Sequence, residues 1–245
     1  MSRFFVGPGS VREEAVIITR PEDIHHIVDV LRLALGDTIV AADIEGWEYT
    51  CEIEAISKVS VRAVITDIQK ASKEPETRVT LFQGVAKGGK LDDTVRKTTE
   101  IGVSAIVPVF MKRTVVADKG NYSKKVKRFR TIAEEASKQS GRGVIPEISD
   151  AVSFDEMIDM LGKFDLVIFC YENEDGRTIK DALREADVKP SNIALVIGPE
   201  GGFSDDEAET LSRIAAEQVS LGKTILRTET AGIAALSMIM YEYEL

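Results

Sequence analysis

The sequence contains few residues of the kinds that build metal centres, disulfide scaffolds or membrane spans. Its 245 residues include only two histidines and two cysteines, and Cys51 and Cys170 lie far apart and in no CxxC pair. This scarcity argues against a zinc site or a disulfide framework, and it is typical of the reducing cytoplasm, where we expect the protein to act without a metal. No apolar run approaches the roughly 18–20 residues that span a bilayer, and the opening MSRFFVGPGSVREE becomes charged too early for a secretion signal, so we expect no membrane association.

Two common nucleotide-binding motifs are also missing. Neither the GxxxxGK[ST] P-loop nor the GxGxxG dinucleotide fingerprint occurs, so ATP and NAD sites lose their usual sequence support. Basic residues are also fewer than acidic ones: the chain has 31 Lys and Arg and 41 Asp and Glu, so its net charge is −10. Taken as a whole-chain value, this charge argues against binding to nucleic acid.

The charge is, however, unevenly distributed. Eight basic residues and one acidic residue lie between Lys112 and Arg130, which gives this segment +7 and the rest of the chain −17. A lysine-rich helix start is often no more than a solvated face. Four of the cations nevertheless crowd the first turn of a predicted helix, where the helix dipole favours acids. A polyanion-binding surface is therefore a second interpretation of the segment.

The first 70 residues have the pattern of a small β-barrel-like module. The spacing of Ile24, Ile27 and Val28 after Pro21 predicts one helix within it. Residues 71–78 are polar and contain Pro75, so we expect a linker there. Short alternating or β-branched runs between turn signals predict strands at residues 4–6, 15–18, 38–42, 49–55 and 59–68.

From residue 79 to residue 245 the pattern changes to alternating strands and helices, which predicts an α/β domain. The near-continuous apolar runs FDLVIF and NIALVI indicate a parallel sheet buried on both faces. We expect strands at 79–83, 105–110, 165–171, 192–197 and 219–221, and helices at 91–101, 124–138 behind Ser123, 155–161, 205–217 and from about 231 to the C-terminus.

The sharpest local motif is GPEGGF, residues 198–203, directly after a predicted strand. Glycine permits close backbone approach to a ligand, and open α/β sheets bind ligands at the carboxyl ends of their strands. Residues 204–207, SDDE, then form a capping box for the next helix. A tight strand-to-helix connection with a good cap explains the same pattern, so the motif alone leaves both interpretations open.

Two further clusters carry polar residues next to predicted helices. The stretch SLGKTILRTETA, residues 220–231, precedes a final helix that is apolar nearly all round, so we expect this loop to lie against the core. The stretch ASKQSGR, residues 136–142, ends the basic helix. Each has a simpler explanation: Arg227 and Glu229 as a surface ion pair, and Arg142 as a cation favoured at a helix C-terminus.

Together these motifs resemble the RsmE family of SPOUT-class RNA methyltransferases, which methylate N3 of a uridine in bacterial 16S ribosomal RNA. The resemblance runs in order along nearly the whole chain. The matching segments are RFF (3–5), HIVDVLR (26–32), KG (87–88), KTTEIGV (97–103), IAEEASKQSGR (132–142), LVIGPEGGFSDDE (195–207) and SLGKTILRTETAGIAAL (220–236).

The resemblance implies a PUA-like RNA-binding module at residues 1–70, followed at residues 79–245 by a SPOUT-type α/β domain with a deep trefoil knot. It also implies a homodimer that acts on 16S rRNA in the 30S subunit with S-adenosyl-L-methionine as cofactor. Three loops, after the strands that end near residues 171, 197 and 221, would hold the cofactor. The implied cofactor residues are Tyr171, Ile197, Gly198, Pro199, Glu200, Gly201, Gly202, Leu221, Gly222, Ile225, Leu226 and Thr230.

Methylation at N3 of uracil requires that the N3 proton leaves and that the three reacting atoms are aligned. A hydrogen-bond donor must also stabilise the negative charge that develops on the uracil carbonyls, which favours arginine. Arg142 and Arg227 are the candidates, and Glu229, Glu200 or water could take the proton. We interpret His26 as a packing residue. Expected RNA contacts are Arg3, Arg32, Lys87, Arg113, Lys124, Lys125, Lys127 and Arg128.

Two other functions remain open at this point. A SPOUT methyltransferase that acts on another RNA position would share the GPEGG core. An RNA-binding assembly factor that has lost catalysis would share the fold but would not bind the cofactor.

Overall fold

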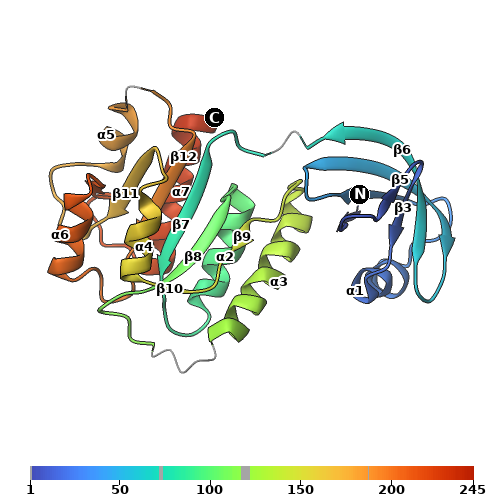
Figure 1. Ribbon diagram of the computed structural model, residues 1–245, viewed down its shortest axis with the longest axis horizontal. Coiled ribbons are helices and arrows are strands. Elements are labelled where there is room, and N and C mark those ends of the chain that lie inside the picture. Colours follow the sequence, from blue (N-terminus) through green and yellow to red (C-terminus); the bar gives the residue numbers. More distant parts are fainter. Residues whose placement is uncertain (1, 72–73, 117–121, 187) are drawn as a thin grey trace. The chain divides into compact units, whose positions relative to one another are not determined.

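The computed structural model describes residues 2–71, 74–116, 122–186 and 188–245 (Figure 1). These residues form two compact units, which are Met1–Glu74 with Ser137–Val144, and Pro75–Ala136 with Ile145–Leu245. The expected linker at 71–78 brackets the first division. The first unit also includes Ser137–Val144, the end of the basic helix and the loop after it, and the local sequence pattern did not predict this.

The first unit is built on a six-stranded sheet with the order β1-β4-β5-β6-β3-β2. The β1–β4 pair is parallel and the other pairs are antiparallel. Phe4, Ile39 and Ile53 belong to a single buried cluster in this unit. The elements are β1 (Ser2–Phe5), β2 (Val11–Arg12), β3 (Ala15–Ile18), α1 (Pro21–His25), η1 (His26–Val30), β4 (Thr38–Ala42), β5 (Trp47–Ile56) and β6 (Val61–Lys70).

The helix after Pro21 differs from the prediction in its second half. Residues His26–Val30 form a π-helical turn, in which the Leu31 N–H donates to the His26 carbonyl at 2.8 Å. The wider turn changes which side chains share a face, so Ile27 is buried whereas Val28 is 36% exposed. His26 is exposed, and its ring lies edge-on to Phe4 with the two centroids 6.1 Å apart.

The second unit contains the predicted parallel sheet. Its strand order is β10-β8-β7-β12-β11-β13, with β9 beside β8, and every pairing is parallel. The elements are β7 (Arg78–Gly84), α2 (Lys90–Ile101), β8 (Ala105–Phe110), α3 (Tyr122–Ser140), β9 (Glu147–Ile148), β10 (Val152–Ser153), α4 (Phe154–Leu161), β11 (Leu166–Cys170), α5 (Ile179–Arg184), β12 (Asn192–Ile197), α6 (Asp205–Arg213), β13 (Glu217–Val219) and α7 (Thr228–Glu244).

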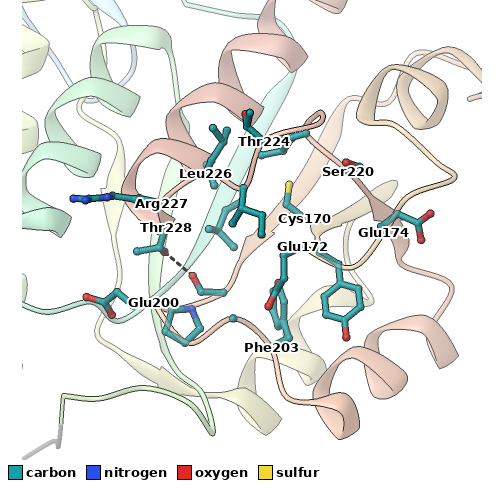
Figure 2. Close-up of a pocket in the computed structure, with 18 of the residues that line it drawn as sticks. Cys170, Glu172, Glu174, Glu200, Phe203, Ser220, Thr224, Leu226, Arg227 and Thr228 are labelled. Atoms are coloured by element: carbon teal, nitrogen blue, oxygen red, sulfur yellow. Dashed lines mark hydrogen bonds between the residues drawn. The ribbon is translucent and has the colours of Figure 1, made fainter.

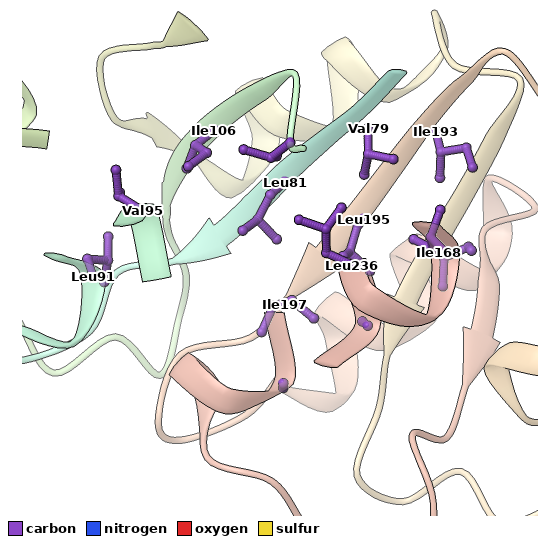
Figure 3. Packing of buried hydrophobic residues seen from close by; sticks show 14 of the residues in the cluster. Val79, Leu81, Leu91, Val95, Ile106, Ile168, Ile193, Leu195, Ile197 and Leu236 are labelled. Carbon is purple, nitrogen blue, oxygen red and sulfur yellow. The ribbon is translucent and has the colours of Figure 1, made fainter. Parts of the chain in front are cut away.

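Helices cover both faces of this sheet, which explains the unbroken apolar strands. Successive strand residues point to opposite faces, so Leu81 and Leu195 pack with α2, α3, α5 and α7 in one core (Figure 3). Phe82 and Val196 pack with α4 and α6 in the other core.

Several predicted boundaries are wrong. Helix α6 ends at Arg213 rather than near 217, because Ala215 adopts a left-handed φ of 58° and turns the chain into β13. Helix α7 begins at Thr228 rather than Ala231, and α3 already includes Ser123 instead of being capped by it. The missed elements are short: the two-residue strands β2, β9 and β10, and the six-residue helix α5.

Candidate active site

A pocket of about 530 Å³ opens at the carboxyl edge of the second unit's sheet (Figure 2). Strands β12, β11 and β13 are neighbours and parallel, so the loops that follow them meet at this edge. These three loops, the first turns of α7 and Lys90 of α2 line the pocket. Its volume lies within the range of small-molecule sites.

The loop after β12, residues 198–203, is fixed by a buried polar chain. The Thr228 hydroxyl donates to the Gly198 carbonyl at 2.6 Å (Figure 2). The same hydroxyl accepts from Gln83 Nε2 at 2.8 Å. A Cβ at Gly84 would lie 2.3 Å from the Pro199 nitrogen, so only glycine lets β7 end this close to the loop. The end of β7 and the start of α7 therefore determine the shape of this wall.

Glycine is also required within the loop itself. Gly202 has a φ of +67°, and a Cβ there would lie 2.0 Å from Glu172 Oε1 in the loop after β11. The absence of a side chain lets two cofactor-binding candidates, the loops after β11 and β12, approach each other at the pocket.

Charged side chains stand on both sides of the pocket. Figure 2 shows Arg227 and Glu200 at the left, Glu172 near the centre beside Phe203, and Glu174 at the far right, with the Arg227 and Glu174 side chains pointing outward. Glu200 Oε1 accepts hydrogen bonds from the Lys87 N–H at 2.9 Å and from Lys90 Nζ at 3.1 Å. Burial opposes ionisation of Glu200, but these two bonds outweigh it and lower its pKa, so Glu200 is an anion at neutral pH.

The two candidate arginines have different surroundings. Arg227 lines the pocket, and within the described ranges no carboxylate pairs with its guanidinium. Arg142 is buried and belongs to the first unit, where its Nη2 lies 2.6 Å from Glu74 Oε2. Glu74 Oε1 also accepts from the Gly143 and Val144 N–H groups. Arg142 is not one of the residues that line the pocket.

The structure brings most predicted cofactor residues together. Thr230 does not line the pocket, because α7 begins earlier than predicted and Thr228 takes the inward position. Glu229 does not line it either, but its Oε2 lies 3.7 Å from Lys90 Nζ. The predicted residues that do line it are Tyr171, Ile197, Gly198, Pro199, Glu200, Gly201, Gly202, Leu221, Gly222, Ile225 and Leu226.

The sequence interpretation missed Gln83, Lys90, Glu172 and Thr228. The sequence does mark Gln83, because it is a polar residue at the end of a buried apolar strand and such a residue needs a hydrogen-bond partner. It marks Lys90 as well, since Lys90 is a cation at the N-terminus of a helix, where the dipole opposes it. It does not mark Glu172, because only the fold brings this residue against Gly202.

The basic segment is partly neutralised in the structure. Four of its cations form ion pairs: Lys112 with Asp206, Arg113 with Asp205, Arg128 with Asp92 and Arg130 with Asp150. Lys119 lies outside the described residues. The lysines of α3 that remain exposed, with no carboxylate partner in the described ranges, are Lys124, Lys125 and Lys127.

The other predicted RNA residues vary in accessibility. Arg3 is mostly buried against Glu48, with Nη1 and Oε1 2.8 Å apart. Arg113 also donates to the Gly201 carbonyl at 3.3 Å, so it supports the loop after β12. Arg32 has a left-handed φ of 55°, and Lys87 is exposed beside Glu200.

Among the described residues, no three His, Cys, Asp or Glu side chains are grouped so that they could hold a metal ion. Cys170 lines the pocket, but burial raises its pKa to about 12, so the thiol stays protonated at neutral pH.

None of the helices in the described ranges has the length and apolar character needed to cross a bilayer.

Comparison with known proteins agrees with the geometry of the site. A model of the RNA methyltransferase domain matches residues 73–240, and one of the RNA methyltransferase PUA domain matches residues 18–66. The chain is 34% identical to Ribosomal RNA small subunit methyltransferase E of Bacillus subtilis, in an alignment that covers 100% of this chain and 98% of that protein.

Two solved structures of similar proteins were crystallised with S-adenosylmethionine. A methyltransferase from Legionella pneumophila is 31% identical, with a TM-score of 0.85 over 98% of this chain and 96% of that one. Ribosomal RNA small subunit methyltransferase E of Neisseria gonorrhoeae is 27% identical, with a TM-score of 0.85 over 98% and 97%. The pocket at the sheet edge, the PUA module and the full-length matches thus lead to one conclusion: this chain belongs to the ribosomal RNA small subunit methyltransferase E (RsmE) family of RNA methyltransferases.

Proposed function

We propose that the protein transfers a methyl group from S-adenosyl-L-methionine to N3 of a specific uridine in the 16S rRNA of the 30S subunit. The observation that carries the proposal is the pocket formed by the loops after β11, β12 and β13, in a chain whose relatives bind this cofactor. An rRNA substrate would place the reaction in the cytoplasm.

The volume of the pocket and the residues that line it are compatible with the cofactor. Close glycine packing at Gly84 and Gly202 leaves backbone amides and carbonyls of the loops to meet an adenosine, as Gly198, Leu221 and Gly222 would. Glu172 lines the cavity and complements a cationic ligand, whereas the Glu174 carboxylate accepts hydrogen bonds from the Gly176 and Arg177 N–H groups and from Gln218 Nε2. When bound, S-adenosylmethionine supplies the methyl group as part of a sulfonium cation.

Arg227 is the residue that we propose to act on the uracil. Arg227 lines the pocket, and its exposed guanidinium, which Figure 2 shows pointing outward, has no carboxylate partner in the described ranges, so it can donate to the carbonyl oxygen of a base bound beside the cofactor. Glu200 is a weak candidate for the base, because the hydrogen bonds from Lys87 and Lys90 lower its pKa and so reduce its affinity for a proton. Glu229 or water therefore remains to accept the N3 proton.

The finer description of the fold is also a proposal. Three loops of adjacent parallel strands that meet in front of a final buried helix support a SPOUT-type trefoil knot. Helix α7 exposes the apolar side chains of Met238 and Tyr241, which supports a homodimer that uses this helix. The N-terminal module and the lysines of α3 would contact the RNA.

Calorimetric titration with S-adenosylmethionine tests the proposed function against a non-catalytic RNA-binding role. We expect saturable heat with one site per chain. A folded protein that gives no heat over a millimolar range of cofactor would contradict a methyltransferase function. ATP serves as the control ligand, since the chain has no P-loop.

A further inference from the structure

One lysine at the pocket contacts acidic groups from two segments that are far apart in the sequence. Lys90 Nζ lies 3.1 Å from Glu200 Oε1, in the loop after β12, and 3.7 Å from Glu229 Oε2, in the first turn of α7. The three side chains are only partly exposed, at 32%, 22% and 21%. The ammonium therefore acts where water screens charges less than it does at an open surface.

Helix stability does not explain a lysine at this position. Lys90 is the first residue of α2, and a cation there opposes the helix dipole, whereas Asp92 and Asp93 in the same turn suit it. The two carboxylates also need a cation between them, because like charges that share one neighbourhood disfavour ionisation of both. Glu229 Oε2 is buried and has no hydrogen-bond donor, so the nearby ammonium is the positive charge that compensates it.

We propose that Lys90 is a positioning residue for methyl transfer, whose ammonium bridges Glu200 and Glu229 and so holds the loop after β12 against the start of α7. This inference rests on the proposed function, because both segments form the cofactor pocket. The bridge holds Glu200, which also accepts from the Lys87 N–H, and it ties the first turn of α7, where Glu229 lies and which Arg227 precedes as N-cap, to the loop after β12. Lys90 itself contacts neither reacting atom in this scheme.

The bridge makes a specific prediction about pH. In Lys90→Met the two carboxylates lose their shared cation, so the repulsion between them is uncompensated at neutral pH and is relieved when acid neutralises one of them. Affinity for S-adenosylmethionine should fall at least about tenfold at pH 7.5 and should recover relative to the wild type as the pH falls to about 5.5. Loss of packing alone would lower the affinity equally at both pH values.

Two further variants separate the charge of Lys90 from its bulk. Lys90→Arg keeps a cation and should bind within about threefold of the wild type. Lys90→Met/Glu229→Gln removes the repulsion and should regain most of the lost affinity with a flat pH profile. The double variant also serves if Lys90→Met alone does not fold, as checked by circular dichroism.

Isothermal titration with S-adenosylmethionine at pH 5.5, 6.5 and 7.5 is the measurement. The expected result is a pH-dependent loss in Lys90→Met that Lys90→Arg and the double variant relieve. A pH-independent ratio to the wild type, or a Lys90→Arg variant as weak as Lys90→Met, would overturn the bridge. A folded wild type that does not bind the cofactor would instead refute the proposed function, and that outcome is distinct from both.

Discussion

Arg142 and Arg227 are equivalent candidates for the same chemical task by sequence, but their partners in the structure differ. Arg227 is at the N-cap of α7 and lines the pocket, while Arg142 is bound by a carboxylate in the other unit. A guanidinium already held by Glu74 must give up that partner before it can bind a developing oxyanion. This difference supports a catalytic role for Arg227 and a structural one for Arg142.

The substitution Arg227→Ala tests the catalytic half of this assignment. We expect the single-turnover rate of methylation to fall by roughly 10²–10³, the usual effect of removing one oxyanion donor. Affinity for S-adenosylmethionine should change little, since the pocket is lined mainly by the loops. Full single-turnover methylation by Arg227→Ala would remove this residue from the chemistry.

The substitution Arg142→Ala tests the structural half. Removing one partner of a buried ion pair leaves Glu74 unpaired, so the free energy of unfolding should fall by roughly 3 kcal/mol in urea denaturation. Glu74→Gln is the matched variant and should fall in the same direction. An unchanged urea midpoint, together with a lower methylation rate, would instead return Arg142 to the active site.

Gly84 offers a steric test of the pocket wall. An alanine Cβ would lie 2.3 Å from the Pro199 nitrogen, so Gly84→Ala must displace the loop after β12. We expect S-adenosylmethionine to bind at least about tenfold more weakly in a titration. Gly162→Ala is the control, because its Cβ would meet no atom within 4 Å and its φ of −63° suits any residue. Equal affinity in the two variants would show that this close approach does not shape the pocket.

At the scale of elements, periodicity predicted the sheet better than it predicted the ends of helices. Strands β3, β4, β8 and β12 have the predicted bounds, because buried strands have a direct apolar signature. Helix α7 begins three residues before its predicted start, at Thr228, whose hydroxyl is part of the polar chain with Gly198 and Gln83. That chain depends on a contact between residues 145 positions apart, which no local pattern contains.

The candidate site was predictable to the extent that it consists of loops. Residues 198–202 and 221–226 lie in motifs that follow strands, and the parallel sheet then places them together. Lys90 and Glu172 reach the pocket from other segments, so their roles depend on tertiary contacts. The charge count also overestimated the positive charge of the basic segment, because four of its cations form ion pairs with acidic residues elsewhere in the chain.

Helix α3 carries the prediction about RNA. Lys124 and Lys127 are three residues apart and exposed on one helix face, so Lys124→Glu/Lys127→Glu should weaken rRNA binding. The slope of log affinity against log salt should also become shallower, by up to about 0.7–0.9 for each phosphate that the protein no longer neutralises. Filter binding from 50 to 300 mM salt measures both. Lys163→Glu/Lys180→Glu is the control with the same charge change on other helices and loops, and an identical salt slope in the two variants would contradict the assignment.

At the scale of the second unit, the end of the chain is fastened to the start of the sheet. The Glu244 carboxylate accepts from the Glu76 and Thr77 N–H groups at 2.9 and 3.0 Å and lies 3.2 Å from Lys189 Nζ. Burial opposes its ionisation, but the hydrogen bonds from Thr77 and Glu76 and the lysine outweigh burial and lower its pKa to about 2.

This low pKa gives stability a defined dependence on pH. Because the pKa of Glu244 lies below its unfolded value of 4.5, its contribution is complete above pH 4.5 and is lost as the pH falls toward 2. The stability difference between the wild type and Glu244→Gln should be at most about 3 kcal/mol at pH 7 and should shrink by pH 3. Urea denaturation at both pH values checks this. Glu209→Gln, at an exposed pair, is the control, and a difference that does not depend on pH would contradict the prediction.

For the whole molecule, the net charge of −10 is compatible with an RNA substrate only because cations and anions are segregated. The exposed lysines of α3 form a local positive surface on an acidic protein, which should favour one face for RNA and disfavour binding elsewhere. We therefore expect the protein to modify a defined RNA substrate rather than to bind RNA in general.

Mass mapping of modified nucleosides tests that expectation most directly. 30S subunits and naked 16S rRNA from a strain that lacks the enzyme are incubated with the protein and S-adenosylmethionine, and the digested RNA is mapped. We expect one new methyl group, on N3 of a single uridine in 16S rRNA, and none without the protein. A methyl group on another base or another RNA, or no methylation by a protein that binds the cofactor, would contradict it.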